Sequence, residues 1–254
     1  MAVGLGQHRH ARHRQPVGVA IASVVTPERF AKGFTFDEYV AYIGTPENLA
    51  REANSGPRRD YSGFLRDAFQ RSRLTDDQKA ALAWLVAQPN GPSKMLVISE
   101  EWSSDCRRDV PTFAHIAADT GMDLRIFTRD GHHFSTANVP SLADAPDSNA
   151  DIMAEFLNHK HGQTWQSIPV CAFYTREMEY LYHFTEYPAI YDKDRLVVQN
   201  IRAPKPGESP EETRARAERE FAELQQSPFF RVWASATVDE IISALHRKLV
   251  LGVV

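Results

Sequence analysis

The sequence predicts an α/β fold in which a central mixed sheet is flanked by helices. The apolar run 95–98 is bounded by turn residues, which is typical of a strand buried on both faces. A helical pattern at 103–119 and a strand pattern at 122–128 follow it, and this order is typical of an α/β domain. Two further apolar stretches, 168–174 and 178–184, are separated by only three residues. We therefore expect these two strands to pair antiparallel.

Helix-start signals precede this block. Thr35 and Glu38 form a capping box, in which the hydroxyl and the carboxylate each satisfy a free backbone donor. Thr26 and Thr45 each stand before a proline at the first helical position, and Thr75 opens a further helix. Each predicted helix is short and has one apolar face, so this part of the chain is expected to be a helical lead-in that packs on the core.

Helices are also predicted after the strands. Ser209 to Glu212 opens a charged helix that runs to about Gln226, and its many Arg and Glu residues are typical of a solvated face. Thr237 to Glu240 opens a last amphipathic helix. One more helix is predicted earlier in the chain, at 150–159.

The chain thus divides into four predicted segments. Residues 1–25 form an N-terminal arm, 26–90 the helical lead-in, 91–203 the core and 204–254 a C-terminal helical extension. The apolar run 17–25 follows basic residues and loosely resembles a secretion signal. We expect it to be a short strand or an ordered arm of a cytoplasmic protein, with secretion as the alternative.

The composition sets limits on the partners. The net charge of this 254-residue chain is −4, which gives no whole-chain electrostatic case for nucleic acid or membrane, and neither partner is expected. Basic residues cluster at His8–Arg14, as in a solvated tail.

The two cysteines, Cys106 and Cys171, cannot build a disulfide framework and fit a reducing compartment. The pairs at His132–His133 and His159/His161 lack evident further ligands, so neither a metal nor a cofactor is predicted.

The stretch 99–111 is the candidate for chemistry. It follows the buried strand, opens the next helix and places Trp102, Ser103 and Cys106 at their junction. A thiol in the first turn of a helix lies near free N–H donors and the positive end of the helix dipole, and both favour the reactive thiolate. The two arginines at 107–108 add positive charge nearby.

This stretch resembles the Trp-Cys-x-x-Cys motif of thioredoxin-like proteins. Trp102 matches the motif's Trp, Cys106 matches its second cysteine, and Pro111 lies where thioredoxins place a helix-kinking proline. The segment Ser167–Val170 resembles the cis-proline segment of the family, which faces the redox motif in space. The resemblance covers about residues 90–185 and implies a thioredoxin-like fold.

Asp105 agrees with a bacterial subgroup that has a helical lead-in and a Trp-Cys-x-Asp-Cys motif. By the same resemblance, the peptide bond before Pro169 is expected to be cis. The resemblance also implies a substrate groove, formed by Trp102, Ser104, Asp105, Ile168 and Pro169.

The chain departs from the family at Ser103, where the attacking cysteine normally stands. A serine hydroxyl is a poor nucleophile without a base, whereas as an N-cap it accepts a hydrogen bond from a first-turn amide. Three roles stay open for Cys106: an inert buried thiol, a monothiol that forms mixed disulfides or is oxidised, or a partner of Cys171.

Three functions follow from these alternatives. The first is a thiol-disulfide oxidoreductase that acts through Cys106, with Ser103 beside it, on a protein or small-molecule thiol or disulfide. The second is a redox-inactive binding protein that holds an extended peptide or a small ligand beside Pro169. The third is a glutathione-transferase-like enzyme, which the roughly ninety residues before the core disfavour, because in those enzymes the thioredoxin-like domain comes first.

Four further residues are weaker candidates. Glu100 and Glu101 precede the motif as potential acid–base groups, although carboxylates in exposed loops are common. Trp165 and Tyr174 are expected either to widen the apolar groove around the proline or to belong to the core.

Overall fold

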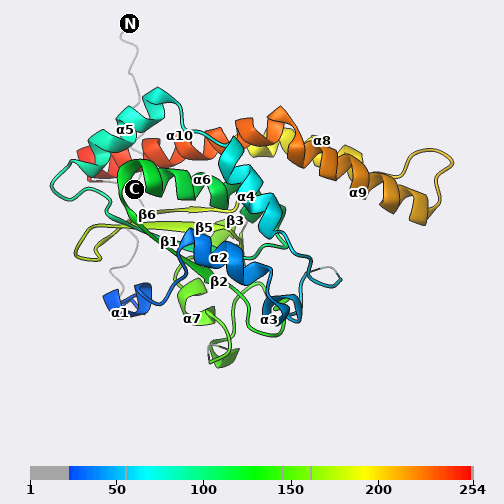
Figure 1. Ribbon diagram of the computed structural model, residues 1–254, viewed down its shortest axis with the longest axis horizontal. Coiled ribbons are helices and arrows are strands. Elements are labelled where there is room, and N and C mark those ends of the chain that lie inside the picture. The colour runs from blue at the N-terminus through cyan, green and yellow to red at the C-terminus, as the bar shows by residue number, and fades with distance from the viewer. Residues whose placement is uncertain (1–22, 55, 145, 161, 253–254) are drawn as a thin grey trace, which may run out of the picture.

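The computed structural model describes residues 23–54, 56–144, 146–160 and 162–252 (Figure 1). The predictions for the basic cluster 8–14 and for residues 17–22 lie outside these ranges. Residues 23–25 form no strand, but Val25 is buried in the core.

A four-stranded mixed sheet forms the centre of the fold. β1 (Lys94–Ser99) pairs parallel with β2 (Asp123–Thr128) and antiparallel with β5 (Val170–Tyr174). β5 in turn pairs antiparallel with β6 (Tyr180–Thr185), which gives the order β2-β1-β5-β6 and confirms the predicted hairpin. The central position of β1 explains its continuous apolar run, because both of its faces are covered.

Helices cover the sheet on both sides (Figure 1). On one side α5 (Asp76–Val86), α6 (Ser104–Thr120) and α10 (Pro228–Leu251) pack against one another, and α4 (Ser62–Arg71) packs on α6. On the other side α2 (Phe36–Ile43) packs on β2. The α/β fold with a central sheet, flanking helices and helical regions at both ends is therefore as predicted.

The predicted helix starts of the lead-in are confirmed. Thr26 caps α1 (Pro27–Phe30) and Thr45 caps α3 (Pro46–Leu49). Complete capping boxes open α2 and α5. In each, the Thr hydroxyl accepts from the backbone N–H of the third helical residue, and the side chain of that residue accepts from the backbone N–H of the Thr.

The helix predicted at 150–159 is wrong beyond its first turn. α7 covers only Ala150–Met153, and the chain then forms a small antiparallel hairpin of β3 (Asn158–Lys160) and β4 (Gln163–Trp165). The buried side chains of Ile152, Met153 and Phe156 have helical spacing, which explains the wrong prediction.

The start predicted for the last helix at Thr237 is also wrong. α10 begins at Pro228, after Ser227. Thr237 lies buried in the middle of the helix, where its hydroxyl donates to the Oδ1 of Asp109 on α6 at 3.2 Å. The hydroxyl thus serves a contact between two helices, which the local sequence pattern does not reveal.

The C-terminal region carries a helical arm. α8 (Tyr191–Arg202), which the sequence analysis missed, lies side by side with α9 (Pro210–Gln226), and both extend away from the sheet (Figure 1). A second apolar cluster joins the arm to the start of α10 through Val198, Leu224, Phe230 and Trp233. Within the described ranges, none of the helices is long and apolar enough to cross a membrane.

Candidate functional site

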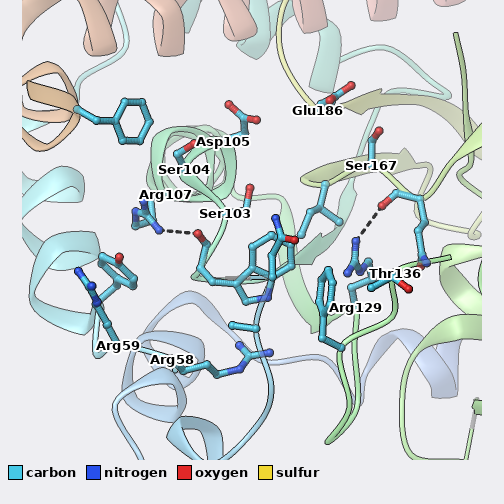
Figure 2. A pocket seen from close by; sticks show the side chains of 18 of the residues that line it. Arg58, Arg59, Ser103, Ser104, Asp105, Arg107, Arg129, Thr136, Ser167 and Glu186 are labelled. Atoms are coloured by element: carbon cyan, nitrogen blue, oxygen red, sulfur yellow. Dashed lines mark hydrogen bonds between the residues drawn. The ribbon is translucent and has the colours of Figure 1, made fainter. Parts of the chain in front are cut away.

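A cleft of about 950 Å³ lies between the start of α6, the segment before β5 and one face of α9. Of the residues that the sequence analysis placed in a site, five line the cleft: Trp102, Ser103, Ser104, Asp105 and Ile168. Cys106 and Pro169 do not line it. Figure 2 shows Arg58, Arg59 and Arg107 on one side of Ser103, with Arg129 and Ser167 on the other side.

Ser103 is the N-cap of α6. Its Oγ accepts a hydrogen bond from the backbone N–H of Cys106, with a long N···O distance of 3.5 Å. The hydroxyl therefore satisfies a donor that the helix leaves free at its start. No basic side chain is hydrogen-bonded to it in the described part of the chain, so nothing activates it as a nucleophile.

The thiol of Cys106 is sealed behind this cap. Only 1% of the residue is exposed, and its Sγ accepts a hydrogen bond from the N–H of Glu100 at 3.5 Å. Burial raises the pKa of the thiol to about 12, although the hydrogen bonds to Sγ oppose the shift. The expectation that the helix start favours a thiolate is therefore wrong for this residue, because desolvation outweighs the helix terminus.

Cys171 gives no sign of a redox pair. It is fully buried in β5 opposite Val97, and both cysteines are free thiols. Burial raises its pKa well above the ordinary value. Cys171 is a core residue of the central sheet.

Glu100 and Glu101 are buried rather than exposed, which corrects the expectation from the sequence. Arg58 lies between them, and its Nη1 donates to Glu100 at 2.7 Å and to both carboxylate oxygens of Glu101 at 2.7 and 2.8 Å. Burial opposes the charge of Arg58, but the two carboxylates raise its pKa above the ordinary value. Both acids are thus committed to structure.

A second arginine completes this buried network. Arg51 donates to Glu100 at 2.9 Å and to the side chain of Asn48, which also donates to Glu101. The N–H of Asp130 donates to the Oε1 of Glu100 at 2.8 Å, the same oxygen that Arg51 contacts. The carboxylate oxygens of Glu100 and Glu101 thus accept hydrogen bonds from protein groups, as buried carboxylates require.

Arg129 and aromatic rings form one wall of the cleft. The Arg129 guanidinium lies 5.4 Å from the ring centres of both Trp102 and Phe134. It is fixed by Asp130 and by the carbonyl oxygen of Gln166, which its Nη1 reaches at 3.2 Å (Figure 2). This arginine is neutralised by its own neighbour and holds the aromatic wall in place.

The segment before β5 continues this wall, since Arg129 donates to the carbonyl oxygen of Gln166, next to Ser167. The Ile168–Pro169 peptide bond is cis. Ser167 and Ile168 line the cleft, and their backbone N–H and C=O groups make no backbone hydrogen bond within the described part of the chain. Trp165 lines the cleft beside them, whereas Tyr174 is buried at the far end of β5 and contributes nothing to the groove.

The two arginines after the motif, whose charge was expected to help the thiol, are hydrogen-bonded to other partners. Arg108 forms ion pairs with Asp105 at 2.7 Å and Asp109 at 2.6 Å. Arg107 lies over the ring of Tyr61, 4.0 Å from its centre, and donates to the carbonyl oxygens of Glu101 and Trp102. No carboxylate pairs with Arg107 in the described part of the chain, and burial lowers its pKa.

The C-terminal arm contributes one wall of the cleft, which was not predicted from the sequence. α9 lines the cleft with Arg214, Ala217, Glu218, Phe221, Ala222 and Gln225. Their spacing of three and four residues marks one helix face. This spacing was visible in the sequence, but only the fold shows which face meets the cleft.

His132 and His133 do not line the cleft. His132 and His133 contact each other, and His133 lies 3.2 Å from Glu52. Among the described residues, no group of three or more His, Cys, Asp or Glu side chains is placed to hold a metal ion. His161 lies outside the described residues.

Comparison with known proteins supports a thioredoxin-like assignment. A family model described as thioredoxin matches residues 62–144. The match begins at α4, within the predicted lead-in, and includes the motif and Pro111. It ends before Pro169. No curated protein matches the chain.

Two solved structures are similar to the chain as a whole. A protein of unknown function from Pseudomonas aeruginosa is 13% identical, with a TM-score of 0.50 over 89% of this chain and 98% of that chain. An HIV epitope scaffold is 14% identical, with a TM-score of 0.47 and the same coverage. At this identity the first likeness concerns the fold alone.

Replacing Arg58 by Met is expected to lower the free energy of unfolding by about 3–5 kcal/mol, because it leaves two buried carboxylates without their shared cation. Chemical denaturation followed by circular dichroism measures this. The neighbouring Arg59→Met is the matched control and should change stability by less than about 0.5 kcal/mol, since Arg59 is exposed. Equal effects of the two substitutions would contradict the structural role of Arg58.

Alkylation of Cys106 by iodoacetamide, measured in a Cys171→Ser background, is expected to be slow and to keep rising beyond about pH 9. The reason is that the folded thiol has a pKa of about 12, against about 8.5 for a free thiol. The same chain unfolded in guanidinium should react with the ordinary thiol profile. A rate for the folded protein that levels off below about pH 8.5 would show an accessible thiolate and refute this assignment.

Proposed function

This chain carries a domain of the thioredoxin-like superfamily, and we propose that it is a redox-inactive binding protein that holds an extended peptide in the cleft beside Ile168. One observation carries the proposal. The cleft opens at the start of α6, where the family motif lies, while the motif's one thiol is sealed behind Ser103. Binding is thus separated from thiol chemistry.

The sealed thiol disfavours the oxidoreductase alternative. A monothiol must reach a substrate sulfur as a thiolate, and Cys106 is both closed off and held protonated. The glutathione-transferase-like alternative is disfavoured by the chain order, because roughly ninety residues precede the core.

The walls of the cleft favour an extended peptide. The unpaired backbone groups of Ser167 and Ile168 offer an edge to which an extended chain can add as a strand. Aromatic side chains on both sides provide apolar contact for alternate side chains of such a peptide. These aromatic residues are Tyr61, Trp102, Phe134, Trp165 and Phe221.

The proposal includes a cytoplasmic location, which two free thiols fit. The proposed partner is a protein or peptide, and it needs no thiol or disulfide, because the proposed function is binding alone.

The binding proposal is tested with fluorescent ten-residue peptides of mixed sequence and fluorescence anisotropy. Ser104→Trp should lower the affinity of any binding peptide by about tenfold or more, because the indole fills the cleft at the start of α6. Glu223→Trp is the matched control on α9 and should have no effect, since Glu223 is exposed and does not line the cleft. Binding that is insensitive to Ser104→Trp, or absent for all peptides, would refute the proposal.

The redox part is tested by an insulin-disulfide reduction assay with dithiothreitol. The wild type is expected to be inactive, and Ser103→Cys to gain activity, because it places a thiol at the open end of α6 three residues before Cys106. Ser104→Cys, which has the wrong spacing, is the control and should stay inactive. If the wild type reduced insulin disulfides and Cys106→Ser abolished this activity, the proposal that the protein is redox-inactive would be wrong.

A further inference from the structure

Six arginines line the cleft, and they differ in how their charge is compensated. Arg58 is held by two glutamates, and Arg129 is held by Asp130. The other four pair with no carboxylate in the described part of the chain: Arg59, Arg107, Arg202 and Arg214. These four are here called the unpaired arginines.

The acids that line the cleft do not cancel this charge. Asp105 pairs with Arg108, and Glu186 lies 3.5 Å from the ammonium of Lys160. Only Glu218, on α9, lines the cleft without an ion pair among the described residues. The cleft is therefore cationic, although the whole chain has a net charge of −4.

Arg107 is the most informative of the four. It is 5% exposed and forms no ion pair within the described chain, and its Nε has no hydrogen-bond partner there. The Nε1 of Trp102, also a cleft residue, is a second buried donor without a partner. A buried cation without an ion pair is costly, and an anionic group bound in the cleft would offset that cost through its charge.

The unpaired arginines come from four separate elements. Arg59 precedes α4, Arg107 is on α6, Arg202 is on α8 and Arg214 is on α9. A single small anion such as phosphate would fill little of a cleft of about 950 Å³ and would meet few of these side chains. Several carboxylates spaced along one chain match this distribution better.

We infer that the ligand of this cleft is an acidic peptide, whose carboxylates pair with the unpaired arginines and whose apolar side chains meet the aromatic walls. The inference rests on the proposed function and specifies its ligand class. It also gives the C-terminal arm a role, because Arg202 and Arg214 both belong to it. The arm supplies half of the unpaired charge and one wall of the cleft.

The test compares two labelled ten-residue peptides with the same apolar residues, one containing glutamates and the other glutamines at the same positions. Fluorescence anisotropy should show about tenfold or tighter binding of the acidic peptide, and this preference should fall as salt is raised. Arg59→Gln and Arg214→Gln should each weaken the acidic peptide about five- to tenfold. Both residues are exposed, so their substitution does not disturb the core.

Arg219→Gln is the matched control, since Arg219 is exposed on α9 but does not line the cleft, and it should leave binding within about twofold. Equal binding of both peptides, blocked by Ser104→Trp, would overturn the acidic preference and keep the proposed function. Binding of a single-stranded DNA oligonucleotide in place of the acidic peptide would overturn the peptide ligand. The absence of binding by either peptide would overturn both proposals.

Discussion

The guanidinium of Arg58 holds Glu100 and Glu101 in the interior, at the point where β1 ends and α6 begins. Two buried carboxylates so close together repel each other and lose their hydration, so they need a cation that is equally buried. Arg58 comes from the loop before α4, far away in the sequence. This ion cluster therefore fixes the lead-in to the central strand and sets the position of Trp102 and Ser103, from which the cleft is built.

The geometry at the start of α6 separates an open surface from the thiol of the motif. The surface at the helix start stays open, lined by Ser103 and Ser104, while the thiol of Cys106 lies one turn inside. A helix terminus favours a thiolate only where solvent or a cation stabilises the charge. Here both neighbouring arginines are turned to other partners, and burial decides the pKa.

The C-terminal arm changes the character of the cleft. α8 and α9 lie beyond the stretch that the family model matches, and α9 closes one side of the cleft with a face that carries both Arg214 and Phe221. The apolar cluster around Trp233 anchors the arm to α10, which itself packs on α5 and α6. A charged helix that looks solvated in isolation thus becomes one wall of the candidate site.

The sequence by itself determined the elements whose causes are local. The capping box at Thr35, the apolar strand 95–98 and the serine cap of α6 depend on neighbours within a few residues, and the structure has all three. Only the tertiary structure decided the state of ionisable groups and the membership of the cleft. Whether Glu101 is exposed or paired depends on Arg58, 43 positions away. Which face of α9 lines the cleft depends on its placement beside α6 and the segment before β5, which periodicity and spacing do not encode.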